Sequence, residues 1–116
     1  MISHVSLHVK NLQESISFYE KYIDVKVVRD LRKLGAQIVF MAADENDETR
    51  LELIQSEETY QGSGISVCFL SDHFDEQRDY YIREGLAVTH VTSPAPGVRF
   101  FFVTDPDGLQ VQIMPE

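Results

Sequence analysis

Residues 2–9 alternate between apolar and polar side chains, which predicts a strand with one face turned toward a core. The polar face of this strand carries His4, Ser6 and His8. Asn11 follows the strand and is a residue type that caps helices, with Glu14 at the capping-box spacing. Apolar residues then recur at helical spacing as far as Ile23, which predicts an amphipathic helix.

Three further strands complete the first half of the chain. Residues 25–31 and 37–42 are short apolar runs separated by a turn at Gly35, and residues 50–55 (RLELIQ) alternate like the first strand. The predicted order of elements in this half is therefore β-α-β-β-β.

The second half repeats this order at an offset of 62 residues, which aligns Tyr19 with Tyr81. We expect strands at 65–71, 86–92, 98–104 and 109–114. We expect a helix that is capped by Asp72, continues through Glu84 and is terminated by Gly85. A rigid loop is expected at 93–97 and a type I turn at 105–108. The sequence shows no linker between the halves, so we expect residues 1–116 to form a single domain, with module one at about 2–56 and module two at about 64–115.

Composition and charge exclude several classes of function. The net charge is −9 and the ten Lys and Arg residues are scattered, which is unfavourable for binding nucleic acid. No apolar run reaches the ~18–20 residues of a membrane span, and no leader-like segment opens the chain, so we expect a cytoplasmic protein. The lone Cys68 lies in a strand-like run and is expected to be a buried structural thiol.

Alternation also selects the side chains of a candidate site. The polar faces of the first and last strand of each half point away from their own helix, and they would line a shared cleft if the two sheets curve toward each other. In the first half this selects His4, Ser6, His8 and Glu52. In the second half it selects Ser66 and Cys68 or their neighbours, together with Gln110, Gln112 and Met114. Arg99 either meets an anionic ligand or pairs with a nearby carboxylate, Asp105 or Asp107. At least one of Phe100, Phe101 and Phe102 must pack in the core, and we place Phe101 in the cleft wall.

The order of motifs resembles the vicinal oxygen chelate superfamily, which includes glyoxalase I, the bleomycin-resistance proteins and the extradiol dioxygenases. The resemblance spans residues 2–114 and rests on a strand that begins with His, the segment SISFYEKYIDVKVV, the run LEL, and DPDG before an alternating strand. It implies an α+β fold of two repeated β-α-β-β-β modules that form a curved mixed sheet around a cleft, usually in a homodimer.

The resemblance also implies where a metal would bind. In metal-dependent members, the first and last strand of each module each supply one ligand to a divalent ion. His4 and Glu52 match these positions, whereas Ser66 replaces the usual His and Gln112 replaces the usual Glu. A serine hydroxyl stays protonated near neutral pH and a Gln oxygen carries no charge, so we predict no metal cofactor, with His4 and Glu52 as the only strong candidate ligands.

These observations favour a metal-independent protein that binds a small organic molecule, with no catalytic residue assigned. One alternative is a lyase or isomerase of the glyoxalase type that uses nickel, zinc, manganese or iron. A second is a non-catalytic dimerisation or regulatory module. His4 and Glu52 either contact the ligand or hydrogen-bond to each other as a satisfied polar pair.

Overall fold

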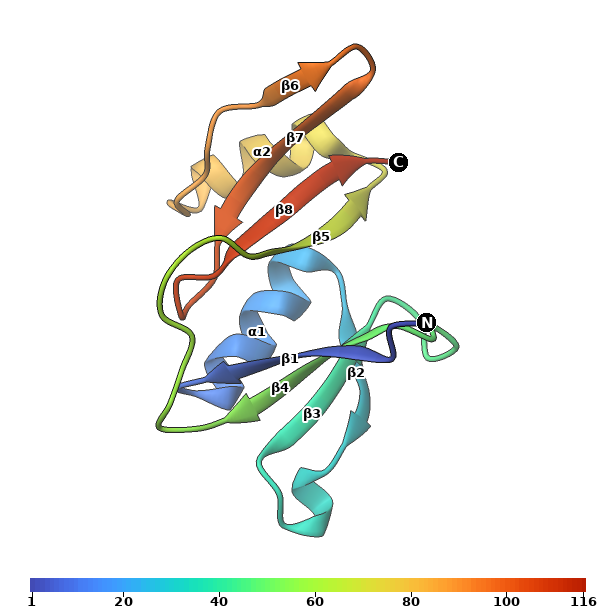
Figure 1. Cartoon of the computed structure of the whole chain (residues 1–116), viewed down its shortest axis with the longest axis vertical. Helices are drawn as coiled ribbons and strands as arrows, with labels where there is room; N and C mark the ends of the chain where they lie inside the picture. The colour runs from blue at the N-terminus through green and yellow to red at the C-terminus, as the bar shows by residue number, and fades with distance from the viewer. The chain divides into compact units, whose positions relative to one another are not determined.

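The computed structural model describes residues 1–116, and the chain divides into two compact units, Met1–Gln61 and Gly62–Glu116. Each unit contains one four-stranded mixed sheet and one α-helix, as the sequence predicts (Figure 1). No helix in the structure combines the length and apolar character needed to cross a bilayer.

The first unit has the order β-α-β-β-β, with a short 3-10 helix before its third strand. Its elements are β1 (His4–Val9), α1 (Leu12–Ile23), β2 (Lys26–Asp30), η1 (Arg32–Leu34), β3 (Ile38–Ala42) and β4 (Arg50–Gln55). The strand order in the sheet is β1-β4-β3-β2, and β1 runs parallel to β4. The crossover from β1 to β2 through α1 places the first and last strands of the unit side by side.

The second unit has the same topology. Its elements are β5 (Ser66–Ser71), α2 (Phe74–Arg83), β6 (Thr92–Ala95), β7 (Val98–Thr104) and β8 (Gln110–Pro115). The strand order is β5-β8-β7-β6, with β5 parallel to β8. The predicted internal repeat is therefore a repeat of structure.

Helix α1 shows how local sequence signals position the first sheet. The Asn11 side chain accepts a hydrogen bond from the backbone N–H of Glu14, which confirms the predicted N-cap. The helix packs its apolar side chains, with Tyr19 fully buried, against one face of the sheet. Because Leu7 and Val9 of β1 are buried on this side, alternation leaves His4 and Ser6 on the other face.

Strand register makes the two units equivalent residue by residue. In the first unit Glu52 of β4 lies between Ser6 of β1 and Phe40 of β3. In the second unit Gln112 of β8 lies between Cys68 of β5 and Phe102 of β7. The alignment of Glu52 with Gln112 is therefore confirmed.

The predicted type I turn between β7 and β8 is also confirmed. The backbone N–H of Gly108 donates to the carbonyl of Asp105 over 3.1 Å. The buried Asp105 carboxylate accepts hydrogen bonds from the backbone N–H groups of Asp107 and Leu109, each over 2.9 Å. This network sets the register that places Gln112 opposite Phe102.

The prediction of a regular strand at 86–92 is wrong. Within that range only Thr92 lies in a strand, β6, and β6 continues into the loop predicted at 93–97. Val88 forms an isolated bridge to Val103, and the Thr89 hydroxyl accepts the N–H of Phe102 in place of a backbone carbonyl. The ladder is thereby interrupted, and pairing resumes at Thr92–Ala95 with a further register shift. Proline within β6 suits this edge position, since an edge strand has unused hydrogen-bonding groups.

The expected cap of the second helix is wrong too. His73, not Asp72, is the residue that precedes α2, and its side chain makes no capping hydrogen bond. The Asp72 carboxylate instead lies 2.6 Å from Nδ1 of His73, and this contact lowers the pKa of Asp72. Gly85 ends the helix region with φ of 78°, as expected.

Candidate functional site

Three polar side chains meet on the face of the first sheet that is turned away from α1. The Ser6 hydroxyl donates a hydrogen bond to Oε1 of Glu52 over 2.5 Å. Nε2 of His4 lies 3.6 Å from the same oxygen. The Glu52 side chain is only 13% exposed and that of His4 is 36% exposed, so the carboxylate is largely shielded while the imidazole remains accessible.

His4 and Glu52 are neighbours, but the hydrogen bond expected between them does not form, and Glu52 accepts one from Ser6 instead. At 3.6 Å, His4 and Glu52 are within ion-pair distance but beyond an ordinary hydrogen bond. Parallel pairing explains this arrangement, since Ser6 is the residue of β1 that lies opposite Glu52. Oγ of Ser3 lies 3.1 Å from the other ring nitrogen of His4, so the imidazole has polar neighbours at both ends.

An aromatic side chain that sequence reasoning missed borders this cluster. The Phe40 ring meets the His4 ring edge to face, with 5.4 Å between centroids. Phe40 lies beside Glu52 in the sheet, and it is the repeat-equivalent of Phe102. The 62-residue offset could have indicated Phe40, because it aligns the two phenylalanines directly.

The matching face of the second unit carries no charge. Ser66 and Cys68 of β5 are exposed, and Gln112 lies opposite Cys68. The expectation that Cys68 is buried is wrong, because it shares the outer face with Ser66 while Val67 and Phe69 turn the other way. Partial desolvation raises the pKa of the Cys68 thiol, which keeps it protonated and poorly nucleophilic.

Two predicted site residues lie on the opposite, helix-facing side. Phe101 is fully buried against Phe74 and Tyr81, so its assignment to the site wall is wrong, and it is a core residue. Nη1 of Arg99 lies 3.1 Å from Asp75, and the guanidinium lies 4.6 Å from the centre of the Phe74 ring. Arg99 thus has the structural pairing that the sequence left open, with Asp75 instead of Asp105 or Asp107.

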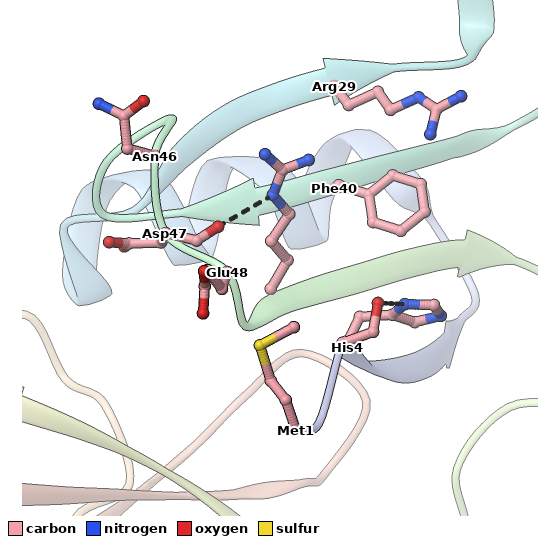
Figure 2. Close-up of a pocket in the computed structure, with 9 residues that line it drawn as sticks. Met1, His4, Arg29, Phe40, Asn46, Asp47 and Glu48 are labelled. Carbon is pink, nitrogen blue, oxygen red and sulfur yellow. Dashed lines mark hydrogen bonds between the residues drawn. The ribbon is translucent and has the colours of Figure 1, made fainter.

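A hollow of about 400 Å³ opens beside the cluster in the first unit (Figure 2). Its lining residues are Met1, Ser3, His4, Arg29, Phe40, Asn46, Asp47, Glu48 and Arg50. Arg29 and Phe40 lie with His4 on one side of it, and the loop that carries Asn46, Asp47 and Glu48 lies on the other.

The model of the Glyoxalase/Bleomycin resistance protein/Dioxygenase superfamily matches residues 1–113. The chain belongs to this superfamily. A curated relative, the uncharacterized protein YwbC of Bacillus subtilis (strain 168), is 27% identical over 116 residues, which cover 92% of this chain and 90% of YwbC.

Solved structures of other proteins share the fold. TnmS3, an antibiotic binding protein from Streptomyces sp. CB03234, superimposes with a TM-score of 0.79 at 19% identity, covering 99% of this chain and 94% of TnmS3. The trypanothione-dependent glyoxalase I of Leishmania major gives a TM-score of 0.77 at 22% identity, covering 100% of this chain and 86% of that enzyme. At these identities the similarity establishes the fold.

The donor set does not fit the divalent metal that many members of the superfamily bind. No group of three or more His, Cys, Asp or Glu side chains is arranged to hold an ion. His4 and Glu52 could supply two ligands, but the equivalent positions Ser66 and Gln112 offer a hydroxyl and an amide. Protein sites for zinc and similar ions use three or more nitrogen, sulfur or carboxylate ligands.

Proposed function

We propose that this protein binds a small organic molecule through His4, Glu52, Ser66 and Gln112, without a tightly held metal ion. The observation that carries the proposal is the His4–Ser6–Glu52 cluster: it presents one accessible imidazole beside one shielded carboxylate, next to an aromatic ring. Such a surface can orient a ligand by hydrogen bonds and supply apolar contact area.

The proposal places the protein in the cytoplasm as a homodimer. TnmS3, described as an antibiotic binding protein, supports a binding function within this fold.

The second candidate is a lyase or isomerase of the glyoxalase type. The separation of 3.6 Å between His4 and Glu52 favours it, because two ligands of one ion stand about this far apart. The structure of glyoxalase I from Leishmania major supports it at the level of the fold. Gln112 weakens it, since an amide cannot act as a general base. Turnover of a methylglyoxal–thiol adduct, dependent on an added metal, would favour this candidate over the binding function.

A ligand screen by NMR tests the proposal. With the imidazole resonances of the protein assigned, a library of small organic molecules is titrated in the presence of a chelator. We expect at least one compound to shift the His4 resonances, and His4→Ala or Glu52→Gln to weaken its binding about tenfold. His90→Ala is the matched control, because His90 is exposed in the second unit and lies outside the proposed site. If no compound shifts His4, or if His90→Ala weakens binding equally, the proposal fails.

A further inference from the structure

We propose that the hollow beside His4 binds the carboxylate of a small aromatic acid, with Arg29 as the anion-binding residue and Phe40 as the aromatic contact. This inference rests on the proposed binding function and names the class of ligand. Arg29 and Phe40 lie outside the four repeat-related positions, so substitution of Arg29 tests the inference separately.

A β-bulge brings Arg29 into the hollow. In β2, Val27 pairs with Met41, but Arg29 pairs with Phe40, so one extra residue lies between the two pairs. The buried Met41 faces the helix, whereas Phe40 lies on the polar side of the sheet next to His4. The bulge therefore turns Arg29 toward the side of the sheet that carries His4. The guanidinium lies 5.8 Å from the centre of the Phe40 ring.

The positive charge of Arg29 is not used by the protein itself. Arg29 is exposed, and its side chain interacts with the Phe40 ring but makes no hydrogen bond or ion pair. Contact with an aromatic face leaves the N–H groups of a guanidinium available, and these match a carboxylate in a bidentate geometry. In a chain of net charge −9, a guanidinium without an ion pair beside a hollow gives an anionic ligand a local positive charge to bind.

A second guanidinium reinforces the positive side. Arg50 is half-buried, and its Nε and Nη2 donate to the backbone carbonyls of Asp47 and Glu45 over 3.3 and 3.1 Å. These bonds hold the side chain in place, but a carbonyl oxygen does not neutralise its charge. Arg50 thus adds positive potential to the hollow without an ion pair of its own.

The acidic side chains set the orientation of the ligand. Asp47 and Glu48 lie on the loop side, across the hollow from Arg29, Phe40 and His4 (Figure 2). A carboxylate would be repelled from the loop and attracted to Arg29. The perpendicular rings of Phe40 and His4 form an aromatic corner beside the guanidinium, which suits a ring attached directly to the carboxylate. The volume of about 400 Å³ lies within the range of about 300–1,000 Å³ that is typical of small-molecule sites.

Calorimetry with two isosteric probes tests the inference. Benzoate and benzamide have nearly the same shape, and only benzoate carries a charge. We expect the protein to bind benzoate about tenfold more tightly than benzamide at low salt, and Arg29→Gln to abolish this preference. Arg83→Gln is the matched control, because Arg83 is also exposed and lies 6.0 Å from the centre of a tyrosine ring, Tyr80, but is not among the residues that line the hollow beside His4. Arg29→Lys should retain only part of the preference, since it keeps the charge and loses the fork.

Three outcomes overturn the inference: equal affinity for the two probes, no detectable binding of benzoate, or an equal effect of Arg83→Gln. The ligand screen described above separates this result from the broader proposal. If other compounds shift His4 while benzoate has no advantage over benzamide, only the inference about aromatic acids fails. If no compound shifts His4, the binding function itself fails.

Discussion

Removal of the Asp105 carboxylate should destabilise the second unit more than most single substitutions. Asp105 is 5% exposed, and its Oδ1 accepts two backbone hydrogen bonds of 2.9 Å, from Asp107 and Leu109. A hydrogen bond to a charged group contributes about 1.5–3 kcal/mol, and an N–H left buried without an acceptor is penalised by about 1–3 kcal/mol. Because both bonds share one oxygen and the Asp107 N–H is only partly buried, we expect Asp105→Ala to lower the free energy of unfolding by about 2–4 kcal/mol.

Urea unfolding measures this change. The chain has five tyrosines and no tryptophan, so far-UV circular dichroism and tyrosine fluorescence are the suitable probes. Asp105→Asn keeps an oxygen acceptor without the charge and should lose about half as much as Asp105→Ala. Asp107→Ala is the control within the same turn, because the backbone N–H that Asp107 donates to Asp105 is retained.

The expected order of destabilisation is therefore Asp105→Ala, then Asp105→Asn, then Asp107→Ala. A loss below about 1 kcal/mol for Asp105→Ala, or an equal loss for Asp107→Ala, would refute the role given to this carboxylate. Such a result would also mean that the Asp105 hydrogen bonds do not set the register that places Gln112 opposite Phe102.

Three other variants test the fold and the donor set. Leu53→Ala, at a fully buried position of β4, should lower stability by about 2–5 kcal/mol in urea unfolding. Asp30→Asn should lower the urea concentration at the unfolding midpoint when unfolding is measured above pH 4, but should have little effect near pH 2. The reason is that Arg32 lowers the pKa of Asp30 to about 2, so the stabilisation from the ionised carboxylate is lost as pH falls from about 4 through that value. The double variant Ser66→His/Gln112→Glu should gain retention of nickel or zinc, measured by mass spectrometry; unchanged retention would refute the ligand placement.

Much of the fold could be predicted because its signals are local. Alternation placed His4 and Ser6 on the polar face, and the Asn11 cap began α1 where expected. The repeat aligned Glu52 with Gln112, which strand register confirms. These features depend on side-chain periodicity and on hydrogen bonds between near neighbours, and both are visible in the sequence.

The errors arise where tertiary contacts replace the local pattern. The apolar pattern favours a strand at 86–92, but the Thr89 hydroxyl interrupts it by accepting the N–H of Phe102 in place of a backbone carbonyl. The periodicity of the sequence does not show which oxygen accepts this hydrogen bond. Phe101 was assigned to the site wall because a run of three phenylalanines does not by itself show which of them faces the helix. Cys68 was expected to be buried from its residue type, although its position in the alternation with Ser66 pointed outward.

The candidate site was only partly predictable. Alternation and the repeat indicate its cluster of His4, Ser6 and Glu52. The position of Arg29 depends instead on a bulge that shifts the pairing of β2 by one residue. An alternating pattern without the bulge would pair Val28 with Phe40 and leave Arg29 on the other face. The anion-binding side of the hollow was therefore not visible in the sequence alone.

Metal content tests the central claim most directly, since the account holds that His4 and Glu52 alone cannot retain an ion. The purified protein is offered nickel, zinc, manganese and iron in turn, desalted, and measured by mass spectrometry beside His4→Ala. We predict far less than one ion per chain in both proteins, with no difference between them. Near-stoichiometric retention that His4→Ala abolishes would contradict the account.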